Sequence, residues 1–170
     1  MVYSTLFRLH SQDLSSEAEV ETRLLAPLFA DLGYPKTAVL PKKSLPSLII
    51  ASGRKKSSIT ADFFLLGKNN KAKVVVEAKE PQESVQDAWG QTASYALSYN
   101  RDKDDGEKIK WLLISNGHIT SLYQVDSERP IVTLKLSDFA SGSPPLMFHY
   151  AHILSILVMM KSLQAASLLA

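Results

Sequence analysis

Asp62, Glu77 and Lys79 are residues whose types and spacing suggest shared chemistry. Two carboxylates held side by side repel each other, so stability alone gives little reason to place them together. A divalent cation resolves that repulsion, and magnesium commonly uses one or two carboxylates together with waters and substrate phosphate. Such a cation lowers the pKa of a bound water, while the lysine could orient or deprotonate that water or neutralise charge on phosphorus. The trio therefore indicates phosphodiester hydrolysis, and the alternative is a surface hairpin with scattered charges.

A β-hairpin would have to bring these three side chains together. Its strands are predicted at residues 59–66 and 73–79, joined by a linker with turn chemistry at Asn69 and Asn70. A two-residue turn, or a four-residue loop, makes the numbers of paired residues sum to 139. Asp62 then lies opposite Glu77, with Cβ atoms about 5 Å apart, and strand alternation puts Lys79 on the same face. A three- or five-residue loop would shift the register and separate the carboxylates.

The rest of the 170-residue chain is predicted to alternate helices and strands within one domain. Pro27 interrupts the helical periodicity of the first helix and predicts a kink or an unwound turn there. Asn116-Gly117 is a strong hairpin signal between two apolar runs. Apart from a short strand, residues 37–58 are predicted to be exposed loop. The predicted elements are a first helix that begins at Ser15 or Ser16 and is stopped by Gly33, helices at 84–100 and about 146–168, and strands at 48–51, 111–115, 119–125 and 131–136.

Composition excludes several classes of function. The chain has no cysteine, so disulfide scaffolds, thiolate zinc sites and cysteine nucleophiles are excluded. It contains no G-x-x-x-x-G-K-[ST] motif and therefore no P-loop motor. No signal peptide and no apolar run of about 18 residues is recognisable, so we expect a cytoplasmic protein without membrane contact.

The charge balance does not by itself indicate nucleic acid. Nineteen basic and 17 acidic residues give a net charge of +2, so DNA binding would require a local basic patch. The run Arg54, Lys55 and Lys56 lies before the strand that carries Asp62 and could contact phosphates. The same run is equally well explained as a solvated loop.

The spacing of Asp62 with Glu77-Ala78-Lys79 resembles the PD-(D/E)XK nuclease signature, although Ala61 replaces its proline. That short motif alone is weak, and four further features strengthen it. They are Glu21-Thr22-Arg23 on the first helix, LGYP at its end, QTASY from Gln91 to Tyr95, and SNG from Ser115 to Gly117. Together, over residues 15–125, they resemble the N-terminal nuclease domain of type I restriction enzyme R subunits.

This resemblance implies an α/β, restriction-endonuclease-like fold with a mixed central β-sheet flanked by helices. A single nuclease domain would occupy residues 1–170, with a C-terminal strand and helix at about 131–168. The implied activity is that of a Mg²⁺-dependent endonuclease acting on double-stranded DNA, with Mn²⁺ as a substitute. The full R subunit would add an ATP-driven helicase or translocase and bind methylase and specificity subunits.

The resemblance also implies a role for each motif residue. Lys79 would be the catalytic lysine, and Gln91 and Tyr95 would support the site. The metal would be held by Asp62, Glu77, the Ala78 carbonyl and Glu21. Glu17, one turn before Glu21, is the alternative to Glu21 as the helix carboxylate. Two other functions remain open: a non-catalytic nucleic-acid-binding or interaction module on the same fold, and another PD-(D/E)XK nuclease such as a repair enzyme.

Overall fold

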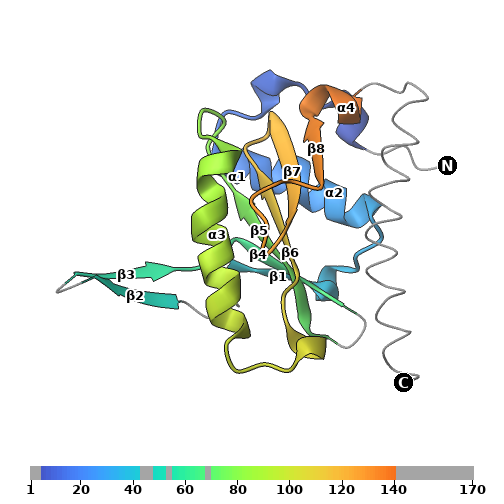
Figure 1. Cartoon of the computed structure of the whole chain (residues 1–170). Helices are drawn as coiled ribbons and strands as arrows, with labels where there is room; N and C mark the ends of the chain where they lie inside the picture. Colours follow the sequence, from blue (N-terminus) through green and yellow to red (C-terminus); the bar gives the residue numbers. More distant parts are fainter. Residues whose placement is uncertain (1–4, 43–47, 53–54, 68–69, 141–170) are drawn as a thin grey trace.

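The computed structural model describes residues 5–42, 48–52, 55–67 and 70–140. Its centre is a mixed six-stranded sheet in the order β1-β4-β5-β6-β7-β8 (Figure 1). Neighbouring strands are antiparallel except β5 and β6, which are parallel and are joined by helix α3. The strands are β1 Val39–Pro41, β4 Phe63–Leu66, β5 Ala72–Ala78, β6 Trp111–Ser115, β7 Ile119–Gln124 and β8 Val132–Lys135.

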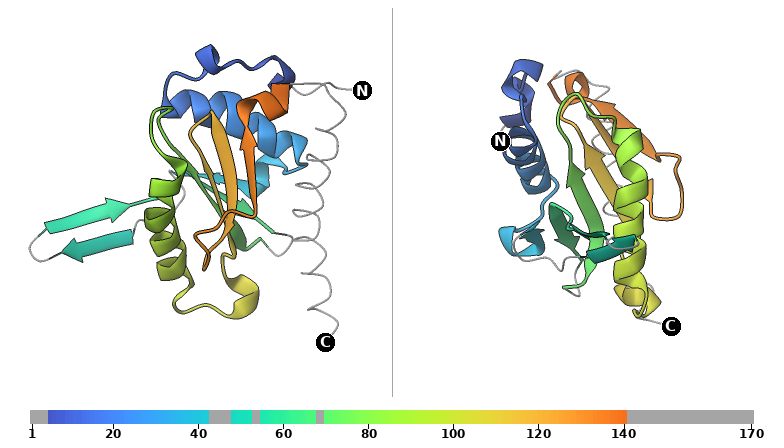
Figure 2. Two further views of the ribbon diagram at one scale, coloured as in Figure 1. Left: turned by 45° about the horizontal axis from the view of Figure 1, so that its top comes forward. Right: turned by 90° about the vertical axis from the view of Figure 1, so that its left-hand side faces the viewer.

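Helices cover both faces of this sheet, as the second view in Figure 2 shows. Helix α3, Val85–Asn100, packs on one face, and the N-terminal helical segment packs on the other. Strand β5 is buried along its whole length between them, which explains its Val-Val-Val sequence. The mixed sheet with flanking helices confirms the predicted fold class.

The hairpin that carries the candidate residues has the predicted register at its functional end. Phe63 pairs with Val76 and Leu65 with Val74, so both pairs sum to 139. Near the loop, however, Leu66 pairs with Ala72, so the predicted turn is wrong by one residue. A bulge between Leu65 and Leu66 absorbs the difference and restores the pairing.

Three predictions for the segment before β5 were wrong. The strand predicted at 59–66 is divided, because β3 ends at Ile59 and β4 begins at Phe63. Strands β3, Lys55–Ile59, and β1 lie where loop was predicted. β3 pairs with β2, Leu48–Ser52, in a separate ribbon that extends away from the sheet (Figure 1). β3 is a strand because its backbone pairs with β2, and β1 is a strand because its backbone pairs with β4. The sequence of β3 lacks the alternation of apolar and polar residues by which a strand is predicted.

The N-terminal helical segment is irregular just before Pro27, the residue from which a kink or an unwound turn was predicted. It consists of α1, Glu17–Glu19, a π-helical stretch η3, Val20–Leu25, and α2, Ala26–Asp31. Proline supplies no N–H to the helical ladder, so the regular pattern changes over the preceding turn. Gly33, at φ 79°, then ends the helix with the Tyr34 N–H donating to the Phe29 carbonyl at 2.9 Å.

The remaining elements largely match their predictions. Helix α3 begins after Ser84, whose hydroxyl accepts from the Asp87 N–H. β6 and β7 form the hairpin predicted at Asn116-Gly117. The last predicted strand is shorter than expected, because the short helix α4, Leu136–Ala140, follows β8. The helix predicted at 146–168 lies outside the described residues. Within the part of the chain that is described, no helix is long and apolar enough to cross a membrane.

Candidate active site

Asp62 lies in the short bend just before β4 and is almost completely buried, at 2% exposure. Its N–H donates to the Val76 carbonyl at 3.2 Å, which continues the pairing of β4 with β5 by one residue. Its Oδ2 accepts the Ala78 N–H at 2.8 Å. The carboxylate is therefore held by backbone on the strand that carries Glu77.

Glu77 and Lys79 form a close ion pair at the end of β5. The Lys79 Nζ lies 2.7 Å from Glu77 Oε1, and both side chains are largely buried. Burial raises the pKa of Glu77 to about 7, the Asp62 charge adds to the increase, and Lys79 opposes it. Burial lowers the pKa of Lys79, but the hydrogen bond and charge of Glu77 outweigh it and raise that pKa overall.

Glu17 and Glu21 both approach Asp62 from the N-terminal helical segment. One carboxylate oxygen from each of the three residues lies within 4.8 Å of the others. Burial raises the pKa of each glutamate, and the Asp62 charge raises it further. The two glutamates, weighed in the sequence as alternatives, therefore lie at the site together.

Lys42 was not predicted as part of the site. Its Nζ lies 2.8 Å from Asp62 Oδ1, and this contact is the largest cause of its raised pKa. The strand pairing explains this contact. Pro41 of β1 pairs with Phe63 of β4, and in this antiparallel pair Lys42 follows Pro41 while Asp62 precedes Phe63. No spacing rule in the sequence links the two, since β1 was predicted as loop.

The two residues of the Q-x-x-x-Y motif have different surroundings on α3. Tyr95 is buried and its ring packs against Phe64 with centroids 5.9 Å apart. Burial raises the pKa of Tyr95 to about 12, and the charges of Tyr99 and Glu77 raise it further. Gln91 is exposed one turn earlier. The structure thus buries Tyr95 against Phe64, whereas Gln91 lies at the surface.

Asn116 of the S-N-G motif fixes the chain that follows Lys79. Its Nδ2 donates to the Glu83 carbonyl at 2.8 Å, while its Oδ1 accepts the N–H groups of His118 and Ile119. The Lys79 N–H also donates to the Ser115 carbonyl at 2.8 Å. The hairpin turn and the loop after β5 are therefore joined at the base of the site.

The charges at this site suit a divalent cation. Four carboxylates, Glu17, Glu21, Asp62 and Glu77, gather around two ammonium groups, Lys42 and Lys79. If all six are charged, the site carries two excess negative charges. The side-chain donors are all oxygen, which is the ligand type that Mg²⁺ and Mn²⁺ prefer. The donor set therefore fits such an ion.

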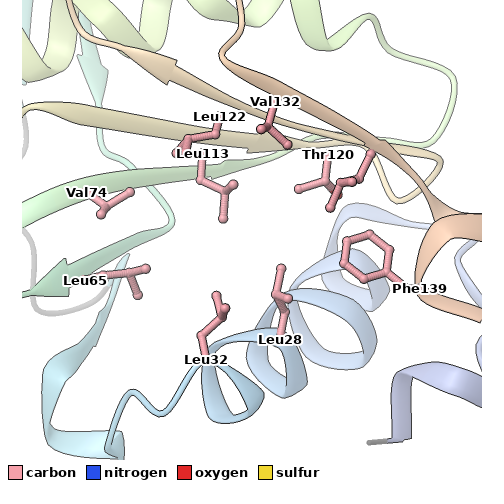
Figure 3. Close-up of a pocket in the computed structure, with 10 residues that line it drawn as sticks. Leu28, Leu32, Leu65, Val74, Leu113, Thr120, Leu122, Val132 and Phe139 are labelled. Atoms are coloured by element: carbon pink, nitrogen blue, oxygen red, sulfur yellow. The ribbon is translucent and has the colours of Figure 1, made fainter. Parts of the chain in front are cut away.

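A separate cavity lies between α2 and the sheet (Figure 3). It holds about 30 Å³ and is lined almost entirely by apolar side chains such as Leu28, Leu113 and Phe139. Its lining contains no carboxylate and no lysine, so the chemistry assigned to the carboxylate cluster has no place there.

Comparison with known proteins identifies the fold. No family model and no curated protein matches the chain. Among solved structures, the DrdV–DNA complex is similar with a TM-score of 0.53 and 10% identity, over 91% of this chain and 14% of that one. A fragment of a putative HsdR subunit of a type I restriction enzyme from Vibrio vulnificus YJ016 is similar with a TM-score of 0.50 and 18% identity. That likeness covers 69% of this chain and 22% of the other.

The chain therefore has a restriction-endonuclease-like fold, as its motifs predicted. It spans only 14% and 22% of the lengths of these two chains. At such low identity the similarity defines the fold, and function has to be argued from the site.

Proposed function

We propose that this chain is a metal-dependent DNA endonuclease domain that hydrolyses phosphodiester bonds. The observation that carries the proposal is the convergence of Glu17 and Glu21 on buried Asp62, beside the Glu77–Lys79 ion pair. The fold supports the same activity, because one similar structure is a complex with DNA and the other is a fragment of a putative subunit of a type I restriction enzyme. A domain within a larger restriction enzyme, working with a translocase and with methylase and specificity subunits, is part of this proposal.

Asp62 and Glu21 would hold Mg²⁺ or Mn²⁺, with Glu17, Glu77 and the Ala78 carbonyl as further oxygen donors. When bound, the ion supplies Lewis-acid stabilisation of phosphate charge and a more acidic water. The rigidity of Asp62 suits this role, because the Ala78 N–H orients its carboxylate from within the sheet.

Lys79 and Glu77 would act on the substrate from the other side of the cluster. Lys79 is anchored on Glu77 at 2.7 Å, so its positive charge is already in position to stabilise charge on the phosphate. Glu77, with a pKa of about 7, can hold or release a proton near neutral pH. Tyr95 would support Glu77 from α3, and Gln91 would assist at the exposed surface of that helix.

Double-stranded DNA is the proposed substrate, and the β2–β3 ribbon is its proposed contact. Residues 42–59 contain five basic residues, among them Arg54, Lys55 and Lys56, and no acidic one. The ribbon extends away from the sheet (Figure 1), and along the sequence it lies between Lys42 and Asp62, which contact each other at the site. A two-stranded ribbon fits the major groove of B-DNA.

A non-catalytic nucleic-acid-binding module is the second candidate. The observation that favours it is the ion pair between Lys42 and Asp62, because it engages an oxygen that a metal would require.

Nicking of supercoiled plasmid by the purified chain, in Mg²⁺ or Mn²⁺ and in EDTA, distinguishes the two candidates. The nuclease proposal expects nicking that requires the divalent ion and falls at least 100-fold in Asp62→Ala. Equal residual activity in both proteins would indicate a contaminating nuclease and would favour the binding module.

A further inference from the structure

We propose that Lys42 is an exchangeable cation of this site, which binds Asp62 when no metal is present and is released to contact DNA phosphate when a divalent ion binds. This inference rests on the proposed nuclease function and adds a residue outside its motifs. Its basis is the meeting of a half-exposed lysine with a fully buried carboxylate at the centre of the acidic cluster.

The two oxygens of Asp62 are both engaged. Oδ2 accepts the Ala78 N–H at 2.8 Å, and Oδ1 lies 2.8 Å from the Lys42 Nζ. A buried, charged carboxylate without a positive partner is strongly disfavoured, so a cation at Oδ1 stabilises it. A metal ion at this oxygen would supply the same positive charge and take the place of Lys42.

Lys42 can leave, whereas Lys79 cannot leave as easily. The Lys42 side chain is 55% exposed, so its ammonium group can return to water without a large desolvation cost. The Lys79 side chain is only 15% exposed and its partner Glu77 only 9%, so that pair is enclosed. The site therefore contains one fixed lysine and one exchangeable lysine.

The charge balance favours release of Lys42 toward an anion. In the metal-free site, two ammonium groups face four carboxylates. Addition of a dication would bring the formal charge to zero and remove the excess negative charge that attracts Lys42. Lys42 also directly follows β1 in the sequence and precedes the β2–β3 ribbon, which is the proposed DNA contact.

The test compares Lys42→Met with Lys110→Met. Lys110 is a matched control, because its Nζ also lies 2.8 Å from a carboxylate, that of Asp105, and its side chain is 50% exposed. Ca²⁺ affinity is measured by isothermal titration calorimetry without DNA. Duplex affinity is measured by fluorescence anisotropy in EDTA and in saturating Ca²⁺. Lys42→Gln, which can still donate a hydrogen bond to Asp62, repeats both measurements in case the methionine variant folds poorly.

Displacement predicts that Lys42→Met binds Ca²⁺ about tenfold more tightly than wild type, while Lys110→Met is unchanged. It also predicts that the loss of duplex affinity in Lys42→Met is several-fold larger in Ca²⁺ than in EDTA. Equal Ca²⁺ affinity of wild type and Lys42→Met would show that Lys42 is not exchangeable. A loss of duplex affinity in Lys42→Met that is the same in EDTA and in Ca²⁺ would show this too. In either case the nuclease proposal would stand. If neither protein binds Ca²⁺, the metal site itself is wrong and this inference is rejected with it.

Discussion

Ionisation of Glu77 should make the metal-free protein less stable as pH rises. Burial raises the pKa of this carboxyl to about 7 from an ordinary value of 4.5. Between these two pH values the folded protein holds a proton that the unfolded chain has released, so the free energy of unfolding falls as pH increases. The difference corresponds to on the order of 3 kcal/mol, present in full below about pH 4.5 and lost above about pH 7.

Glu77→Gln removes this titration while it keeps the shape of the side chain and an oxygen that Lys79 can contact. Urea denaturation in EDTA at several pH values between 4 and 8 gives the free energy of unfolding of both proteins. The stability of Glu77→Gln minus that of wild type should increase by about 3 kcal/mol across this range. The comparison cancels the titration of groups that both proteins share.

Glu107→Gln is the control, because Glu107 also pairs with a lysine, Lys71 at 2.6 Å, but lies on the surface. The hydrogen bond and charge of Lys71 lower the pKa of Glu107, so its contribution is present at neutral pH and is lost on acidification. Its variant should therefore show a small pH dependence of the opposite sign. If the stability difference between Glu77→Gln and wild type does not change from pH 4 to 8, burial beside Asp62 does not raise the pKa of Glu77.

Other substitutions test the supports of the site and its approach to DNA. Asn116→Ala removes hydrogen bonds to two backbone segments and should lower the unfolding free energy by about 2–4 kcal/mol in urea denaturation. Gly117 has φ +85°, and Gly117→Ala would place a Cβ 3.0 Å from two side chains. The variant should unfold with about 1–3 kcal/mol less free energy and therefore melt at a lower temperature. Replacement of Arg54, Lys55 and Lys56 by Ser should reduce the salt dependence of duplex binding by about 1–3 in log–log slope, and an unchanged slope would exclude the ribbon as a DNA contact.

The sequence predicts the site hairpin well because a buried strand allows few registers. Val74 and Val76 belong on the face opposite Glu77, and a shift by one residue would reverse every side chain of β5. The bulge beside Leu66 therefore changes the loop and leaves the register intact from Leu65 to Phe63, the residue next to Asp62. Turn geometry is the weaker constraint, which is why the predicted loop was wrong while the pairing was right.

Lys42 could not be predicted because its place depends on pairing across the sheet. It follows β1, whose three residues carry too short a pattern to identify a strand, and only the pairing with β4 brings it to Asp62. The helix glutamates differ from Lys42, because their spacing along the chain is local. Residues four apart lie on one helix face, so the sequence predicts a carboxylate there without excluding either one.

Binding of a divalent ion such as Mn²⁺ is the property that the carboxylate cluster must have if it is a metal site. Isothermal titration calorimetry at pH 7.5 would compare wild type with Asp62→Asn and with Glu107→Gln, in which a partly exposed carboxylate paired with Lys71, at the opposite end of β5 from Glu77, is changed. We expect Mn²⁺ to bind wild type and Glu107→Gln, and to bind Asp62→Asn at least tenfold more weakly. Equal affinity in all three proteins, or no binding to wild type, would contradict this expectation.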